Sequence, residues 1–84
     1  MKHAGPEALD QIEGLLAKVR RHAALGERKR GLFYLKSSAL LHFHEDPAGM
    51  FADLKIDGEF QRFRVSTRDE QAAFLRELAR VLAH

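Results

Sequence analysis

Two histidines, an aspartate and an arginine are the residues of this sequence whose types and spacing could do chemistry. His42 and His44 are two positions apart in an alternating run, so on a strand both side chains would point to one face. Asp53 and Arg62 occur in the next two alternating runs. An imidazole beside a carboxylate and a guanidinium could transfer protons or hold an anionic ligand. His42 and His44 could instead supply two metal ligands, with Asp53 or Glu45 as a third.

Ordinary surface structure is the competing interpretation of the same residues. The sequence has no motif such as HExxH to anchor a metal site, and no glycine-rich phosphate loop for a cofactor. No nucleophile is placed beside the histidine–aspartate pair. We therefore assign no catalytic residue, no metal and no cofactor from the sequence. On this interpretation the face carries cross-strand charge pairs, each worth about 0.2–1 kcal/mol.

Three predicted strands position these side chains, at about residues 39–45, 50–56 and 59–65. The turn Asp46-Pro47-Ala48-Gly49 has aspartate, proline and glycine at the positions that a β-turn favours. Asp57-Gly58 is a strong signal for a two-residue hairpin loop, because both positions of a type I′ turn need positive φ. These two turns fix the register of the three strands.

The predicted register divides the side chains into two faces, because directly opposite residues share a face. The inner face should carry the apolar core residues Leu41, Phe43, Met50, Ala52, Leu54, Ile56, Phe63 and Val65. The outer face should carry three rows: His44 with Phe51 and Arg64, His42 with Asp53 and Arg62, and Leu40 with Lys55 and Phe60.

Helices are predicted at both ends of the chain. Apolar residues recur at three- and four-residue spacing from Leu9 to Ala23, which predicts a helix over about 6–25 that stops at Gly26. Residues 27–31 are predicted to be a solvated connection. Thr67 and Glu70 match a capping box at the start of a second helix over about 68–83. Residues 32–35 are predicted to be a short strand that either pairs with the next strand or continues into it.

The fold class that follows is α+β. We expect a single domain over residues 1–84, built as a two-layer sandwich in which an antiparallel β-meander of three to four strands is flanked by an N-terminal and a C-terminal helix.

The outer face is predicted to be an interaction surface. Leu40, Phe51 and Phe60 are large apolar residues on a face that has no third layer, and such a patch commonly marks an interface. The leading hypothesis is a non-enzymatic module that binds a protein partner or forms a homodimer; in the alternative, residues 32–35 or the N-terminal residues cover part of the patch. The candidate binding residues are Leu40, His42, His44, Phe51, Asp53, Phe60, Arg62 and Arg64. The second hypothesis is a small-ligand or metal site, with or without catalysis, on this face.

A basic segment supports a third and weaker hypothesis. Residues 18–36 contain seven basic residues and one acidic residue, whereas the chain as a whole has a net charge of only +2. Arg28, Lys29 and Arg30 could contact phosphates, with Phe33 and Tyr34 as stacking groups. Several of these charges also complement the end of the predicted first helix. No nucleic-acid-binding motif accompanies them.

The composition limits the cellular location and the kinds of site that this protein can have. The chain has no cysteine, which excludes disulfides and thiolate metal sites. No apolar run approaches the roughly 20 residues of a membrane span, and no apolar secretory signal precedes the first helix. We therefore expect a cytoplasmic protein without a membrane partner.

Residues 32–82 also resemble a group of small bacterial α+β proteins. The shared pattern runs from Phe33-Tyr34-x-Lys36 through LHFH at 41–44, FADLK at 51–55 and FxRFxV at 60–65 to a final helix. The resemblance implies a bacterial origin and the same fold class, and it carries no activity and no functional residues.

Overall fold

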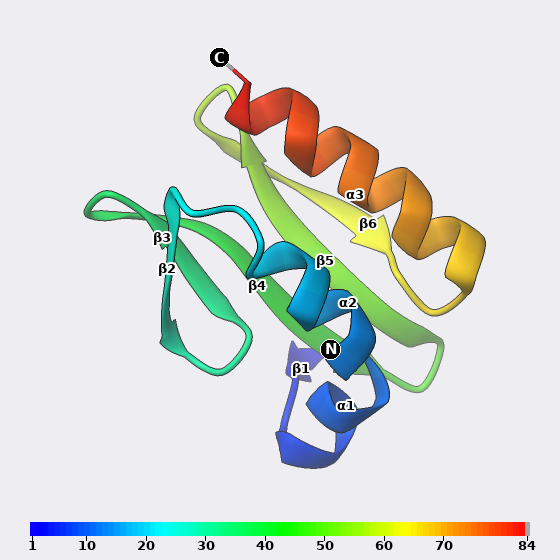
Figure 1. Cartoon of the computed structure of the whole chain (residues 1–84). Helices are drawn as coiled ribbons and strands as arrows, with labels where there is room; N and C mark the ends of the chain where they lie inside the picture. The colour runs from blue at the N-terminus through cyan, green and yellow to red at the C-terminus, as the bar shows by residue number, and fades with distance from the viewer. Residues whose placement is uncertain (84) are drawn as a thin grey trace.

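The computed structural model describes residues 1–83 and has the predicted α+β architecture. A six-stranded antiparallel sheet is combined with helices at the N-terminal and C-terminal ends of the chain (Figure 1). In chain order the elements are β1 (Lys2–His3), α1 (Pro6–Gln11), α2 (Glu13–Val19), β2 (Leu25–Lys29), β3 (Leu32–Leu35), β4 (Ser38–Asp46), β5 (Gly49–Ile56), β6 (Glu59–Arg64) and α3 (Arg68–Leu82).

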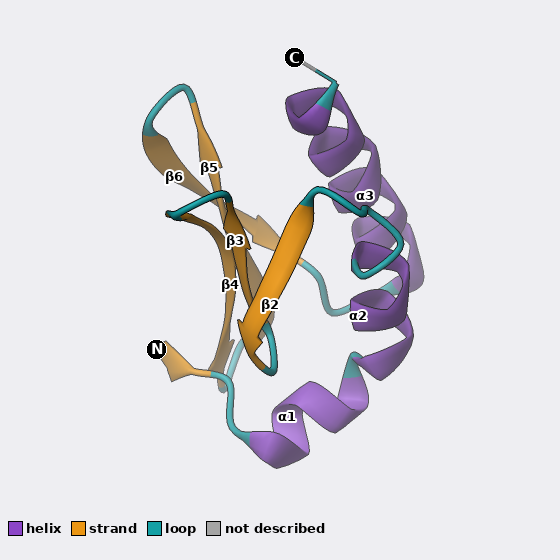
Figure 2. Ribbon diagram, turned by 60° about the vertical axis from the view of Figure 1, so that its left-hand side comes forward, coloured by secondary structure: helices purple, strands orange, loops and turns teal. Residues whose placement is uncertain are grey.

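The helices lie on one face of the sheet, as the two-layer prediction requires. Figure 2 shows α1, α2 and α3 on the same side of the strands, with the opposite face of the sheet uncovered. The strand order is β2-β3-β4-β5-β6, and the short strand β1 pairs with β4 off this path. β1 pairs with residues 44 and 45 of β4, whereas β3 pairs with residues 38–42, so β1 and β3 follow one another along the same edge of β4.

The register of the three long strands is the predicted one. Asp57 and Gly58 have φ of 52° and 82°, as a type I′ turn requires. Asp53 is therefore opposite both Arg62 on β6 and His42 on β4. His44, Phe51 and Arg64 form the neighbouring row. Both turns form as predicted, so the rows of His44 and His42 lie on the outer face as expected. Leu40 does not join Lys55 and Phe60 in a third row: the β3–β4 register skips it at a bulge, and it belongs to the hydrophobic core.

The N-terminal helical region differs from the single helix predicted over 6–25. It is two short helices that meet at Ile12, whose φ of −115° and ψ of 23° interrupt the α conformation. The apolar stripe survives the break, because Leu9, Ile12, Leu16 and Val19 are all buried. The helix ends at Val19 and the chain then turns, because the residues from Leu25 onward pair with β3 as a strand.

The basic segment is the second correction. Residues 25–29 are not a helix end followed by a solvated loop; they form β2, which pairs with β3. The segment 32–35 is a separate strand that pairs with β4, and Lys36 takes φ of 58° in the turn between them. Together with β1, these strands raise the number from the predicted three to four to six.

Gly31 in the β2–β3 turn explains how this hairpin packs against α1. It is buried, and its φ of 82° lies in the left-handed region. A Cβ built at this position would come 2.8 Å from Cδ2 of Leu9. The conformation of the turn favours glycine, and a larger residue would in addition have to displace the Leu9 side chain.

The core lies between the helices and the inner face of the sheet. All the residues predicted for that face are in it: six are buried, while Ile56 and Phe63 are partly buried against them. Phe74 of α3 packs with its ring centroid 6.2 Å from Phe43 and 5.9 Å from Phe63. This packing leaves the outward-pointing residues of β4, β5 and β6 to form the opposite surface.

The capping box at α3 is present as predicted, and it leads to the first testable prediction. Thr67 Oγ1 accepts a hydrogen bond from Glu70 N at 3.1 Å, and Glu70 Oε1 accepts one from Thr67 N at 2.9 Å. Replacing Thr67 with alanine should lower the free energy of unfolding by about 1 kcal/mol. Urea denaturation measures this loss, and Thr67→Ser, which keeps the hydroxyl, should retain most of the stability. Equal stability of the alanine and serine variants would contradict the role of the cap.

Candidate metal centre on the outer sheet face

A bidentate ion pair lies at the middle of the outer face. Asp53 is 7% exposed, although it is a charged residue in a two-layer protein. Arg62 donates from Nε to Oδ1 and from Nη2 to Oδ2, both at 2.9 Å, and the arginine side chain is half-exposed. Paired donors of this kind fix the plane of the carboxylate as well as its charge. The predicted Asp53–Arg62 contact is therefore present and holds Asp53 in one orientation.

Two histidines stand beside this carboxylate. His42 Nδ1 is 2.9 Å from His44 Nε2, and His44 Nε2 is 3.2 Å from Asp53 Oδ2. Both contacts are hydrogen bonds if His44 Nε2 carries the proton and points it toward Asp53 Oδ2 and His42 Nδ1. His42 Nδ1 then accepts with its lone pair. This tautomer is assigned from the contacts. His42 then already presents an unprotonated nitrogen to the cluster.

A third histidine, His3, completes the group and was missed by the sequence reasoning. β1 places it directly opposite His44, so both share the outer face. Its ring centroid is 4.6 Å from that of His44 and 5.5 Å from that of His42. β1 thus extends the sheet at the edge of β4 and adds the His3 side chain to the outer face, without folding over Phe51 or Phe60. A two-residue strand has no periodicity that a sequence pattern could reveal.

The histidine pKa values are shifted in the direction that metal ligation needs. Burial, together with the neighbouring His44, holds the pKa of His42 below its ordinary value. Burial also lowers the pKa of His44, against the opposing effect of the Asp53 charge. Burial alone would raise the pKa of Asp53, but the hydrogen bonds and charge of Arg62 keep it below the ordinary range. At neutral pH the cluster is two neutral imidazoles beside an ionised carboxylate.

These shifts predict how the metal-free protein responds to acid. Because folding lowers the pKa of His42 and His44, the unfolded chain takes up protons as pH falls through about 6.5, and the folded chain resists. The free energy of unfolding should therefore fall between pH 7.5 and pH 5.5. Urea denaturation with a chelator present measures it, and a His42→Gln/His44→Gln variant should lose less. An equal loss in both proteins would contradict the shifts.

The three histidines fit the requirements of a transition-metal ion. One ring nitrogen from each of His3, His42 and His44 can be chosen so that all lie within 4.8 Å of one another. A zinc ion bonds imidazole nitrogen at about 2.0–2.1 Å, so tetrahedral ligands stand about 3.4 Å apart. His42 and His44 are neighbours on the outer face of β4, and with Nε2–H of His44 directed at Asp53, this ring would bind the ion through Nδ1. His3 is exposed and can approach by rotating its side chain.

Of the three apolar residues predicted to form a binding patch on this face, only Phe60 is largely exposed to solvent. Leu40 is 6% exposed and Phe51 is partly buried, whereas Phe60 is 45% exposed. The Phe60 ring centroid lies 4.8 Å from that of His42, and Lys55 Nζ lies 5.2 Å from the Phe60 centroid. The apolar surface available to a partner is therefore centred on Phe60, not on a patch of three residues.

Part of the charge of the basic segment is paired with neighbouring carboxylates at the surface. Arg30 lies 2.7 Å from Asp10 and 2.8 Å from Glu13, and the guanidinium of Arg28 lies 4.3 Å from the Tyr34 ring centroid. Arg20 is bound by Glu13 and Glu27. Of the three residues proposed to contact phosphate, Arg30 is thus offset by carboxylates, which weakens the electrostatic basis of that hypothesis.

Comparison with known proteins assigns no family to this chain. No protein-family model, no curated protein and no solved structure matches the chain. The resemblance to small bacterial proteins therefore stays a prediction, and the function has to be argued from the site. Within residues 1–83, no helix is long and apolar enough to cross a membrane.

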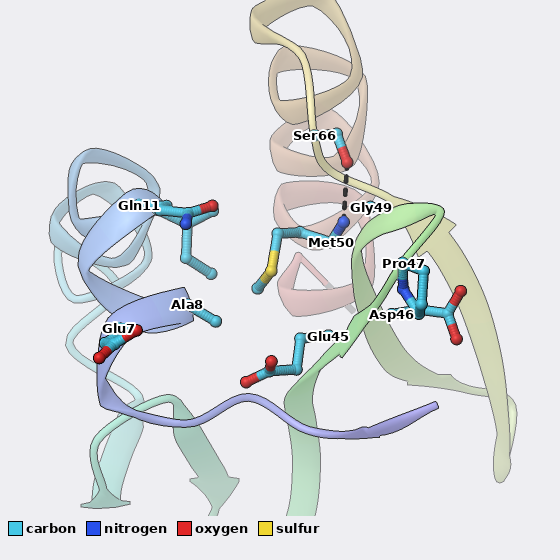
Figure 3. Close-up of a pocket in the computed structure, with 10 residues that line it drawn as sticks. Glu7, Ala8, Gln11, Glu45, Asp46, Pro47, Gly49, Met50 and Ser66 are labelled. Atoms are coloured by element: carbon cyan, nitrogen blue, oxygen red, sulfur yellow. Dashed lines mark hydrogen bonds between the residues drawn. The ribbon is translucent and has the colours of Figure 1, made fainter.

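Pockets adjoin the strands that carry the cluster, and two of them bear on the argument. One, of about 450 Å³, lies between α1 and the β4–β5 turn; Glu45 points into it and Asp46 points away (Figure 3). Glu45 is held there by Gly5, whose N–H donates to Oε2 at 2.7 Å, and Ser66 accepts a hydrogen bond from Met50 N across its rim. The other, of about 460 Å³, includes His3 and His42 in its wall. Of these two pockets, the second shares residues with the histidine cluster.

Proposed function

We propose that this protein binds a divalent transition-metal ion, with zinc as the reference case, through His3, His42 and His44. The observation that carries the proposal is the convergence of three imidazole nitrogens within 4.8 Å on one face of the sheet. Neutral imidazole is the commonest metal ligand in proteins, and three histidines are a ligand set of zinc sites with an open position.

The residues around the histidines support the proposal. Metal-bound histidines usually have a carboxylate or carbonyl partner that fixes the ring and raises its basicity. Asp53 stands in that position toward His44 at 3.2 Å, and the bidentate Arg62 restrains it. Because Arg62 engages both carboxylate oxygens, Asp53 is assigned as the partner of a ligand and not as a ligand itself. The low pKa values of His42 and His44 reduce competition from protons.

Titration calorimetry of the metal-free protein with zinc tests the proposal. We expect one ion per chain, with proton release that makes the affinity rise between pH 6 and pH 8. A His42→Gln/His44→Gln variant, checked for cooperative unfolding, should give no heat beyond dilution. Absence of binding by the wild-type protein at micromolar to millimolar zinc would end the proposal.

Self-association through the outer face is a second candidate, because Phe60 is 45% exposed. Replacing Phe60 with aspartate should then convert a dimer into a monomer, since it puts a charge into the apolar centre of the contact. Light scattering coupled to size exclusion measures the mass, and Gln61→Asp on the same strand is the matched control. A wild-type protein that stays monomeric at millimolar concentration would rule out this candidate.

A further inference from the structure

The pocket that adjoins the histidine cluster lies on the side away from Asp53. Its wall comes from β1 and the following Ala4, from α1, from the β2–β3 hairpin and from β4, whereas Asp53 and Arg62 belong to β5 and β6. It occupies the interval along the β4 edge where β3 has ended and β1 has begun. His3 and His42 therefore lie between the Asp53 carboxylate on one side and an open pocket of about 460 Å³ on the other.

This arrangement leaves a coordination position for a ligand from outside the protein. Three histidines fill three of the four positions of a tetrahedral zinc ion. Asp53 is engaged by Arg62 through both oxygens, so it does not supply the fourth. The pocket is in contact with two of the three ligands, so a molecule bound in it can place a donor atom beside the ion.

The chemistry of the pocket wall indicates what that ligand is. Leu9, Leu32 and Phe43 provide an apolar surface. Lys29 and Arg30 are its cations, and no carboxylate is among its lining residues. Arg30 is offset by Asp10 and Glu13, whereas Lys29 makes no ion pair within residues 1–83. A volume of this size is in the range of small-molecule sites, which reach about 300–1,000 Å³.

We infer that the pocket binds a small monocarboxylate with an apolar body, whose carboxylate occupies the open position of the metal ion held by His3, His42 and His44. This inference rests on the proposed metal site. The carboxylate is a hard anionic ligand suited to a divalent ion and to the charge of Lys29, while the apolar body lies against Leu9, Leu32 and Phe43. Phosphate shares the oxyanion chemistry but has no apolar body.

Visible absorption of the cobalt(II)-loaded protein tests the inference, because cobalt reports a change of ligand directly. Hexanoate should shift the cobalt bands and bind at least tenfold more tightly than acetate or inorganic phosphate. Lys29→Gln should weaken hexanoate about fivefold and leave cobalt affinity unchanged, whereas Lys18→Gln, on an exposed helix end, should change neither.

The outcomes separate this inference from the metal proposal. If cobalt fails to bind, the metal site itself is wrong. If cobalt binds and hexanoate leaves its spectrum unchanged, the metal site stands and the inference is overturned. Equal affinity for hexanoate and acetate would also overturn it, because the apolar wall would then have no role. Tighter binding of phosphate than of hexanoate would show an oxyanion site of another kind and would likewise overturn it.

Discussion

Replacing His44 with alanine should weaken zinc binding by about 100-fold or more, because it removes a residue that binds the ion directly. Even the loss of a residue that only hydrogen-bonds a metal ligand weakens metal binding by about 10–100-fold. His44 is central to the cluster: its Nε2 lies 2.9 Å from His42 Nδ1 and 3.2 Å from Asp53 Oδ2. Its loss removes a ligand and also separates Asp53 from the metal. Competition of the protein with a chromogenic zinc chelator measures the change.

A series of single variants tests the number of ligands. His42→Ala should behave like His44→Ala, whereas His3→Ala should cost less, about tenfold, because the exposed His3 must move to reach the ion. His22→Ala is the matched control, since His22 follows α2 and lies outside the cluster. If His3→Ala bound zinc as tightly as the wild type, the site would be a two-histidine site.

Asp53→Asn is the substitution with the largest combined effect on stability and binding. The amide has the shape of the carboxylate but no charge, so Arg62 loses its ion pair and His44 loses its anionic partner. Because Asp53 is only 7% exposed, an imperfectly paired amide there should cost about 1–3 kcal/mol in the free energy of unfolding. Zinc affinity should fall about 10–100-fold through the lost partner of a ligand.

Urea denaturation and zinc competition on the same preparation measure both effects of Asp53→Asn. Glu59→Gln is the matched control, since it removes an exposed carboxylate from β6 and should change neither quantity. A variant that loses stability but keeps full zinc affinity would show that Asp53 serves only the fold. The assignment of Asp53 as a partner of the metal ligand would then be wrong.

The sequence predicts the long strands well because their signals are local. Asp57-Gly58 needs positive φ at two positions, and that requirement alone sets which residue of β6 faces Asp53. The alternation of Leu41, His42, Phe43 and His44 then sorts the faces. The Asp53–Arg62 pair followed from these local rules, without any knowledge of the tertiary structure.

The elements that the sequence does not predict are those decided by tertiary contacts. Ala23 and Ala24 are good helix formers, yet the helix stops at Val19 because Leu25–Lys29 pairs with β3. β1 is two residues long and exists only because β4 offers it an edge beyond the end of β3. For this reason His3, and with it the third metal ligand, was outside the reach of pattern analysis.

The accessible apolar surface was overestimated for a related reason. Ideal strand alternation places Leu40 and Phe51 on the outer face, but it reveals neither the bulge at Leu40 nor how much of Phe51 the neighbouring residues cover. Leu40 is 6% exposed because it lies at the register shift between β3 and β4 and packs in the core, which the alternating pattern does not show. Only Phe60, on the edge strand β6, keeps the exposure that the prediction gave to all three.

X-ray absorption spectroscopy of the zinc-loaded protein is the most direct test of the metal centre. Imidazole rings give characteristic outer-shell scattering, so the spectrum reports how many histidines bind the ion. We predict three imidazoles and one further nitrogen or oxygen ligand, all at about 2.0–2.1 Å. A first shell of oxygen ligands with one imidazole or none would show that His3, His42 and His44 do not form a metal centre.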